Sequence, residues 1–168
     1  MEQVLCAIVL SKINEQIERT DHLVGLLPES HLDWSPPAPN AFSAGILLGH
    51  LLECCAGFCA ALFAVEPDRL RHFSDLRKLA VSHRCDRAQA RERIGVYKSR
   101  IQEGFALLQD SDLQKLVPTL FVKEGEALLT LLLGNLEHLV NHKHQLFMYV
   151  KLMGIDVGSR DLYHFRGE

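Results

Sequence analysis

The chain has 168 residues, of which 48% are apolar and 23% charged, and its formal net charge is −3. This length accommodates one domain, residues 1–168, around a full hydrophobic core. The weak negative charge excludes a general electrostatic attraction to nucleic acid. The five Cys residues are odd in number and contain no C-x-x-C pair, so we expect reduced thiols and a cytoplasmic location rather than a disulfide framework.

Positive charge is concentrated in one part of the chain. Residues 69–100 hold ten of the eighteen Lys and Arg residues against three acidic residues, which gives this stretch a formal charge of +7. Such a stretch could attract an anionic ligand. The simpler interpretation is a solvated helix face, because no interleaved aromatic residues and no nucleic-acid-binding motif accompany it.

The first part of the chain predicts a helix followed by an irregular loop. Apolar residues recur at helical spacing from about Gln3 to Leu26, and Pro28 ends the pattern. The next segment, Glu29 to Phe42, contains Trp34 and three prolines that forbid a regular helix. We expect this segment to be an ordered loop that crosses one end of the fold.

A second helix is expected from Ser43, as its N-cap, to about Ala64. Residues 46–65 are almost entirely apolar and are long enough to cross a membrane. His50 and Glu53 interrupt them, so a buried helix lined with functional groups is the better interpretation. The apolar N-terminus lacks a preceding positive segment, which argues against a signal peptide.

The middle of the chain is less regular. Residues 66–84 are ambiguous, although a short helix at Ser74–Val81 is plausible. A third helix is expected to begin with Asp86 as its N-cap and to end at the polar residues 110–112. Residues 113–124 then form a connection that we expect to be partly extended.

The fourth helix is predicted from about Gly125 to Met153, with Gly154 as its natural stop. Four amphipathic helices in a domain of this size predict a four-helix bundle, whose sites are built from inward-facing side chains. The tail that follows should pack back onto the bundle through apolar side chains. These are Val157, Leu162, Tyr163 and Phe165.

Three histidines suggest a metal site. His138 and His142 are four residues apart, so they lie on one helix face, one turn above the other. His50, on another helix, would complete a three-nitrogen site with open positions for water or substrate. A single His on an apolar face is more often a core residue, and a helical His pair is often a surface pair. The prediction of a metal site therefore depends on the three histidines occurring together.

The residues beside the predicted ligands allow several roles. Gln145 lies near the same face and could orient a ligand or a bound water. Tyr149 is expected mainly to pack in the core, with its hydroxyl as a possible extra contact. His144 lies about 200° around the helix from His142 and should face outward.

Two residues on the second helix are also candidates. Glu53 follows His50 by three residues and could accept a hydrogen bond or act as a general base, or it could lie at the exposed edge of the bundle. Cys54 shares the face of His50 and could be a metal ligand. A helix-interior Cys more often serves as a small hydrophobic residue.

The order and spacing of these residues resemble the DinB/YfiT-like superfamily, whose members are regarded as metalloenzymes. The similarity covers the prolines and Trp of the first loop, the segment 43–53 that contains His50, and the run from His138 to Gln145. It continues to Gly154, so it spans nearly the whole chain. The chain departs from the family pattern at two positions, with Lys143 where Arg is usual and His144 where Gly is usual.

The resemblance implies an all-α, up-down-down-up four-helix bundle and frequent homodimers. It also implies a divalent metal, zinc or nickel ahead of iron, held by His50, His138 and His142. Neither departure from the family pattern affects these three positions.

The resemblance also suggests a reaction class. Characterised relatives include thiol-dependent S-transferases and a mycothiol-dependent isomerase, which are thought to activate a low-molecular-weight thiol at the metal. The leading hypothesis is therefore a metal-dependent, thiol-dependent S-transferase acting on a small molecule, with Gln145 and Glu53 as candidates for orientation or proton transfer. The alternatives are a metal-dependent hydrolase and a non-catalytic module that binds a metal or a small ligand.

Overall fold

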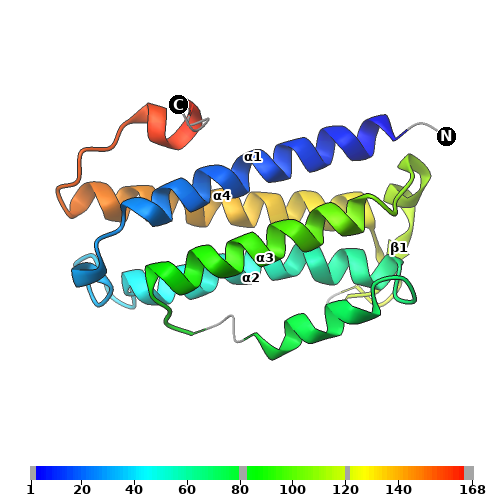
Figure 1. Ribbon diagram of the computed structural model, residues 1–168, viewed down its shortest axis with the longest axis horizontal. Helices are drawn as coiled ribbons and strands as arrows, with labels where there is room; N and C mark the ends of the chain where they lie inside the picture. Colours follow the sequence, from blue (N-terminus) through cyan, green and yellow to red (C-terminus); the bar gives the residue numbers. More distant parts are fainter. Residues whose placement is uncertain (1–2, 80–82, 120–121, 165–168) are drawn as a thin grey trace.

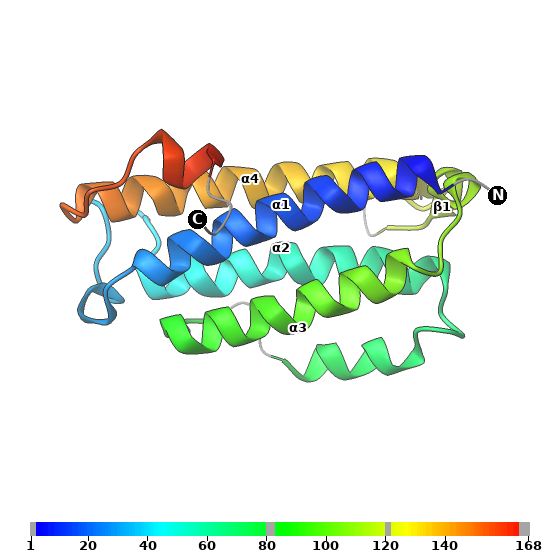
Figure 2. The same ribbon diagram turned by 45° about the horizontal axis from the view of Figure 1, so that its top comes forward.

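The computed structural model describes residues 3–79, 83–119 and 122–164. It contains four long helices: α1 (Val4–Leu26), α2 (Ala44–Val65), α3 (Arg87–Phe105) and α4 (Leu128–Leu152). Helices α1 and α2 each pack against both α3 and α4. Helices α1 and α4 begin at one end of the molecule and α2 and α3 at the other, as Figures 1 and 2 show. The all-α, up-down-down-up bundle expected from the sequence is thereby confirmed.

The remaining elements are short. Two strands, β1 (Leu116–Val117) and β2 (Glu126–Ala127), form an antiparallel pair between α3 and α4. The 3₁₀-helical segments are Glu29–His31, Arg71–Lys78 and Asp110–Gln114, and a π-helical turn occupies Arg160–His164. The core is filled from all four long helices by fully buried side chains such as Ile13, Leu51, Tyr97 and Leu139.

The predicted N-caps of two helices are confirmed. The Ser43 hydroxyl accepts a hydrogen bond from the backbone N–H of Ile46 at 3.3 Å. The Asp86 carboxylate accepts from the N–H of Gln89 at 2.7 Å, and the Gln89 side chain accepts from the N–H of Asp86 in return. These contacts satisfy N–H groups that have no partner within the helix.

The predicted end of the third helix is wrong, because α3 stops at Phe105, before residues 110–112. Asp110 instead caps a different helix. Its carboxylate accepts hydrogen bonds from the backbone N–H groups of Leu5 and Cys6 in the first turn of α1, at 3.0 and 2.9 Å. These bonds to Cys6 and Leu5 hold the pKa of Asp110 below its usual value. The carboxylate thus balances the positive end of the α1 dipole.

The fourth helix begins three residues later than expected. Gly125 has a φ of 92°, a conformation that favours glycine, and it turns the chain into β2. Helix α4 therefore starts at Leu128, and the partly extended connection before it is confirmed. The short helix expected at Ser74–Val81 starts earlier, as the 3₁₀ segment Arg71–Lys78, and positions 80–82 lie outside the described residues.

The C-terminal turn packs against α1, as expected, but through fewer side chains. Val157 and Leu162 are buried at 6% and 4% exposure. Tyr163 is 53% exposed, so its predicted burial is wrong, and Phe165 lies outside the described residues. A hydrogen bond between His22 Nε2 and Asp161 Oδ1, at 2.9 Å, binds the turn to α1 instead of a third apolar contact.

The positive stretch pairs with acidic side chains of α1 and the following loop. Arg91 binds Asp21 at 2.8 Å, and Lys98 binds Glu18 at 2.7 Å. Arg84 binds Asp33 of the loop at 2.9 Å. Exposed pairs of this kind add little stability, but they neutralise one another's charge. The arrangement supports the solvated helix face rather than an anion site.

Helix α2 is long and apolar enough to cross a membrane by length and composition alone. Within the described residues it is the one helix that meets this test, and 61% of its most apolar window is buried inside the molecule. This burial is the pattern of a core helix. All five Cys side chains are buried and free of disulfide bonds, and burial raises the pKa of the Cys54 thiol to about 12.

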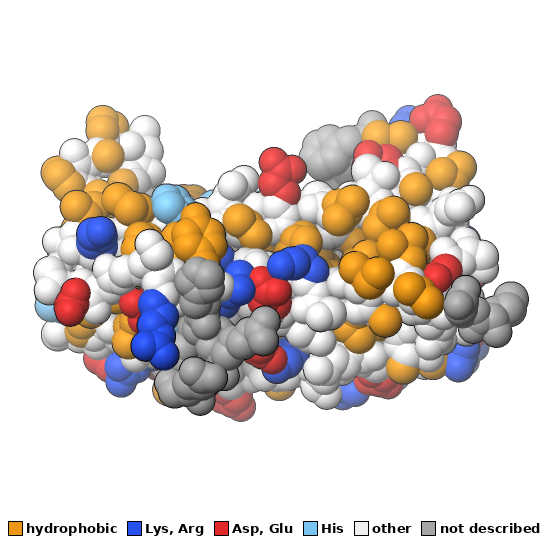
Figure 3. All heavy atoms as spheres, turned by 90° about the horizontal axis from the view of Figure 1, so that it is seen from above, with side chains coloured by type: hydrophobic (Ala, Val, Ile, Leu, Met, Phe, Trp, Pro, Cys, Tyr) orange, Lys and Arg blue, Asp and Glu red, His pale blue; other side chains and the backbone are white. Residues whose placement is uncertain are grey.

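Exposed apolar side chains gather on one face of the part of the chain that the structure describes. They include Val4, Leu5 and Ile8 of α1 and Leu133 and Val140 of α4, all of which are exposed. Figure 3 shows hydrophobic side chains gathered on this face, toward the end where α1 begins. We refer to these five residues as the α1/α4 patch.

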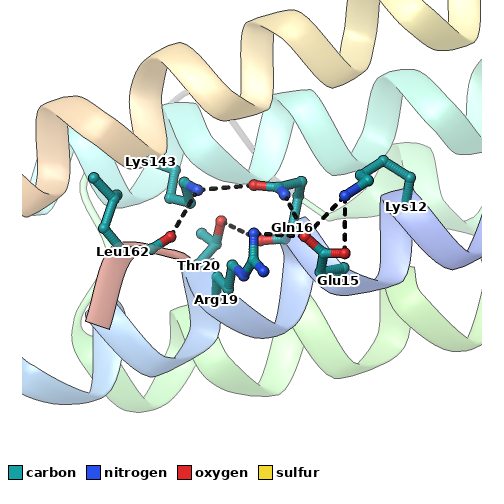
Figure 4. A network of polar contacts seen from close by, with 7 residues as sticks. All are labelled: Lys12, Glu15, Gln16, Arg19, Thr20, Lys143 and Leu162. Carbon is teal, nitrogen blue, oxygen red and sulfur yellow. Dashed lines mark hydrogen bonds and ion pairs between the residues drawn. The ribbon is translucent and has the colours of Figure 1, made fainter. Parts of the chain in front are cut away.

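Lys143 is buried between α4, α1 and the C-terminal turn, although it carries an ammonium group. It is 2% exposed and donates hydrogen bonds to Gln16 Oε1 at 2.8 Å and to the carbonyl of Leu162 at 3.2 Å, as Figure 4 shows. The Gln16 amide in turn donates to the carboxylate of Glu15. Burial, helped by the nearby charge of Arg19, lowers the pKa of Lys143 to about 8.

This burial predicts a pH-dependent stability. Between about pH 8 and pH 10.5, Lys143 is neutral in the folded protein and still protonated in the unfolded chain. The unfolded state then binds more protons, so the contribution of Lys143 to the free energy of unfolding rises with pH over this window, by up to about 3 kcal/mol. Denaturant unfolding of the parent and of Lys143→Met at a series of pH values measures the difference.

The exposed Lys151 of the same helix provides the control. Lys151→Met should retain the pH profile of the parent, because its ammonium is solvated in both states, whereas Lys143→Met should lose the rise. Identical profiles for the parent and Lys143→Met would contradict the prediction.

Candidate metal centre

The three predicted histidines converge where α2 and α4 face each other. His50 lies in the second turn of α2, and His138 and His142 lie in the middle of α4. Each offers a ring nitrogen, and these nitrogens all lie within 4.8 Å of one another. The ring centroid of His50 is 5.2 Å from that of His138 and 4.4 Å from that of His142. A zinc–nitrogen bond is about 2.0–2.1 Å long, so this cluster is compact enough for one ion.

A close approach of the two helices makes this convergence possible. At Gly57, two turns after His50, a side-chain Cβ would overlap the side-chain amide of Asn135 on α4. The absence of a side chain at Gly57 leaves room for the Asn135 amide against α2. Sequence reasoning missed this pair. The spacing in the sequence could have indicated this pair. Gly57 follows His50 by seven residues, and Asn135 precedes His138 by three, so each lies on the same helix face as its histidine.

Hydrogen bonds orient two of the three imidazole rings. His142 Nδ1 lies 2.9 Å from Gln145 Oε1, and His50 Nδ1 is paired with the carboxylate of Glu53. Carboxylate and amide oxygens accept hydrogen bonds, so each Nδ1 carries the proton. The Nε2 lone pairs of both rings remain available for a metal, which is the arrangement found in histidine–metal sites. The donor set therefore fits a divalent ion.

The surroundings of the third ring favour its neutral form. Burial lowers the pKa of His138, and positive charge on His142 or His50 would lower it further, while Glu53 opposes the shift. A neutral imidazole is the form that binds a metal. His138 is thus prepared for coordination near neutral pH.

Tyr149 ties the first loop to the centre. Its hydroxyl accepts a hydrogen bond from Gln145 Nε2 at 3.2 Å and donates to the carbonyl of Phe42 at 3.1 Å. The edge of the Trp34 ring meets the Tyr149 ring at a centroid distance of 5.3 Å, and the Phe42 ring lies 5.4 Å from that of His50. Tyr149 is 4% exposed, so it packs in the core as expected and its hydroxyl also holds the loop.

Backbone contacts fix the same loop at its other side. The N–H groups of Ala44 and Gly45, at the start of α2, donate to the carbonyls of Trp34 and Leu32, each at 2.8 Å. A Cβ at Gly45 would lie 2.9 Å from Arg84 Cγ, so this junction leaves little room for a larger residue. The loop therefore crosses the end of the bundle in a defined position beside the histidines.

Two further candidates fall outside the cluster. Cys54 is buried, and its thiol donates to the backbone carbonyl of His50 at 3.7 Å, so it acts as a small core residue rather than a ligand. His144 is exposed, and its ring lies near that of Phe147, with the centroids 6.0 Å apart. Its predicted outward orientation is confirmed.

Comparison with known proteins agrees with this geometry. The family model of the DinB superfamily matches residues 12–146, which include all three histidines. The chain belongs to the DinB superfamily. The structure is also similar to the crystal structure of a DinB-like protein (YjoA) from Bacillus subtilis, with a TM-score of 0.66 and 20% sequence identity over 89% of this chain and 94% of that one. This likeness shows a shared fold. No curated protein matches the chain.

The cluster predicts stoichiometric metal binding. Elemental analysis of untagged protein should find roughly one equivalent of divalent metal in the parent and little in His142→Ala, because two imidazoles hold an ion far less tightly than three. His144→Ala is the matched control, since it removes an exposed imidazole from the same helix and should leave the metal content unchanged. Absence of metal from the parent, even after reconstitution with zinc and with nickel, would exclude the site.

Proposed function

We propose that this DinB-superfamily protein is a metal-dependent enzyme that transfers a group to or from the sulfur of a low-molecular-weight thiol. The observation that carries the proposal is the cluster of three imidazoles, two with their Nδ1 protons held by acceptors. A divalent ion at such a site, zinc or nickel, retains open positions and lowers the pKa of a thiol or water that reaches it.

The residues around the cluster have distinct proposed roles. His50, His138 and His142 hold the ion. Glu53 orients His50, and its side chain is 28% exposed, so it can also accept a proton from an incoming thiol or water. Gln145 orients His142 and keeps its Nε2 directed at the cluster.

Aromatic side chains of the first loop suggest where the second substrate, the molecule that accepts the thiol sulfur, would bind beside the cluster. Phe42 is 38% exposed and lies against His50, while Trp34 is partly buried against Tyr149. These rings present apolar surface to a small molecule that approaches the histidines. We propose that they bind the apolar part of this second substrate and limit the access of water to the three histidines.

Hydrolysis is the second candidate reaction. The carboxylate of Glu53 adjoins His50, and a carboxylate placed this way can also take a proton from an attacking water whose pKa a bound metal has lowered. The two reactions differ in whether turnover requires added thiol, and a non-catalytic binding module would bind metal without turnover.

A thiol titration tests the transferase directly. Metal-loaded parent protein is assayed with an electrophilic acceptor, 1-chloro-2,4-dinitrobenzene, over a range of 2-mercaptoethanol or glutathione concentrations. The rate should saturate with thiol and vanish in His142→Ala. Glu53→Gln should lower the rate by about 10–100-fold, because the neutral amide loses both the charge that supports His50 and the proton-accepting function.

The control is again His144→Ala, which should retain the parent rate. Metal-dependent turnover of ester substrates without any thiol requirement would replace the transferase with a hydrolase. Full metal content with no turnover of either kind would leave the binding module as the function.

We also propose that two copies associate through the α1/α4 patch. Ile8 is 60% and Leu133 is 49% exposed, and a contiguous apolar patch on a protein surface can mark an interaction site. Light scattering should find a dimer for the parent and a monomer for the double variant Ile8→Glu/Leu133→Glu. Val96→Glu, at an exposed apolar position on α3, is the matched control and should remain dimeric. A monomeric parent would contradict the proposal.

A further inference from the structure

A cavity lies away from the histidines of the candidate centre, between α2 and the 3₁₀ segment Arg71–Lys78. Its volume is about 580 Å³. The segment runs along the outside of the bundle in both Figure 1 and Figure 2. Cavities of roughly 300–1,000 Å³ are the size that proteins use for small molecules.

Alanines of α2 form one wall of this cavity. Ala56, Ala60 and Ala64 recur every four residues, so they line one face of the helix. Ala60 and Ala64 are exposed even though their neighbours on α2 are core residues. Small side chains at these positions leave the space open, and a larger side chain there would enter the cavity rather than the core.

The opposite wall is held in place by contacts to the rest of the bundle. Phe73 is 4% exposed and anchors the segment in the core, and Leu76 and Leu79 line the cavity beside it. His72 Nε2 pairs with Glu103 of α3 at 2.8 Å, and Glu103 is bound in turn by Arg100. The segment is therefore supported at a distance from α2 instead of collapsing onto it.

The lining chemistry selects an uncharged occupant. No charged side chain is among the lining residues that the structure describes. The polar groups are the hydroxyl of Ser74 and the thiol of Cys59, which is 3% exposed and donates to the carbonyl of Tyr97. A charged ligand would lose its hydration without gaining a counter-charge, whereas a hydrocarbon gains from leaving water.

The cavity is also separate from the metal centre. Ala60 follows His50 by ten residues, which places it about 15 Å further along α2 and about 80° around its axis. A molecule held there would contact α2 and the 3₁₀ segment but none of the three histidines of the candidate centre.

We propose that this cavity is a binding site for one small, uncharged, largely hydrocarbon molecule. The site is independent of the metal centre and of the reaction proposed for it. Its size and its position between a helix and a short segment suit a compact ring system or a short hydrocarbon chain rather than a polypeptide.

Fluorescence titration with N-phenyl-1-naphthylamine, an uncharged apolar probe, tests the site. The parent should bind the probe saturably at a single site, and Ala60→Phe should weaken binding by at least about 10-fold because the new ring occupies the cavity. Ala88→Phe is the matched control, since Ala88 is an exposed alanine of α3, and it should bind like the parent. Thermal unfolding of both variants verifies that each is folded.

His142→Ala separates this proposal from the proposed function. It leaves the cavity lining intact, so it should bind the probe like the parent whether or not the protein has metal-dependent activity. Failure of the parent to bind saturably would overturn the proposal. Equal binding by folded Ala60→Phe and Ala88→Phe would also overturn it, because the probe would then be bound elsewhere, for example on the α1/α4 patch.

Discussion

The close contact between α2 and α4 is the constraint on which the candidate centre depends. One candidate ligand lies on α2 and two lie on α4, so their separation is set by the distance between the two helices. Gly57 and Asn135 lie where the two helices meet, and a Cβ on Gly57 would overlap the amide of Asn135. Imidazole ligands reach only about 2 Å to a metal, so even a small separation of the helices would leave His50 out of range of the other two.

Polar groups around this contact are satisfied in ways that also hold the architecture together. Buried polar groups are costly unless they are hydrogen-bonded. Glu53 and Gln145 accept hydrogen bonds from the imidazole N–H groups of His50 and His142. Tyr149 connects α4 to the first loop through Phe42. On the other side of α4, Lys143 binds Gln16 and the C-terminal turn. The fourth helix is therefore fixed on one side by the candidate centre and on the other by a buried ammonium.

Much of this arrangement follows from local patterns in the sequence. Helical spacing predicts the four helices, and the four-residue spacing of His138 and His142 predicts their shared face. The N-caps Ser43 and Asp86 are also local signals, since each contact lies within one turn. The close positions of His50 and the other two ligands follow from inward-facing placement in a bundle.

The features that the sequence does not reveal all depend on distant partners. Asp110 is a plausible helix terminator until the start of α1 is placed beside it, where it becomes a cap. Lysine is a residue type usually found at the surface, and the burial of Lys143 depends on the C-terminal turn, which folds over it. Tyr163 is apolar enough to be buried, but it is exposed in a turn that a hydrogen bond between His22 and Asp161 joins to α1. Such contacts are set by tertiary packing, which periodicity does not encode.

The hydrogen bonds that lead from the centre to the loop all point in one direction. His142 donates to Gln145, Gln145 to Tyr149, and Tyr149 to the carbonyl of Phe42. Successive donors in such a chain polarise one another, so the electron density on the ring of His142 depends on the last acceptor. A molecule that displaces Phe42 would therefore lower the basicity of His142, which lies three hydrogen bonds away. The loop is thus an electronic as well as a steric neighbour of the centre.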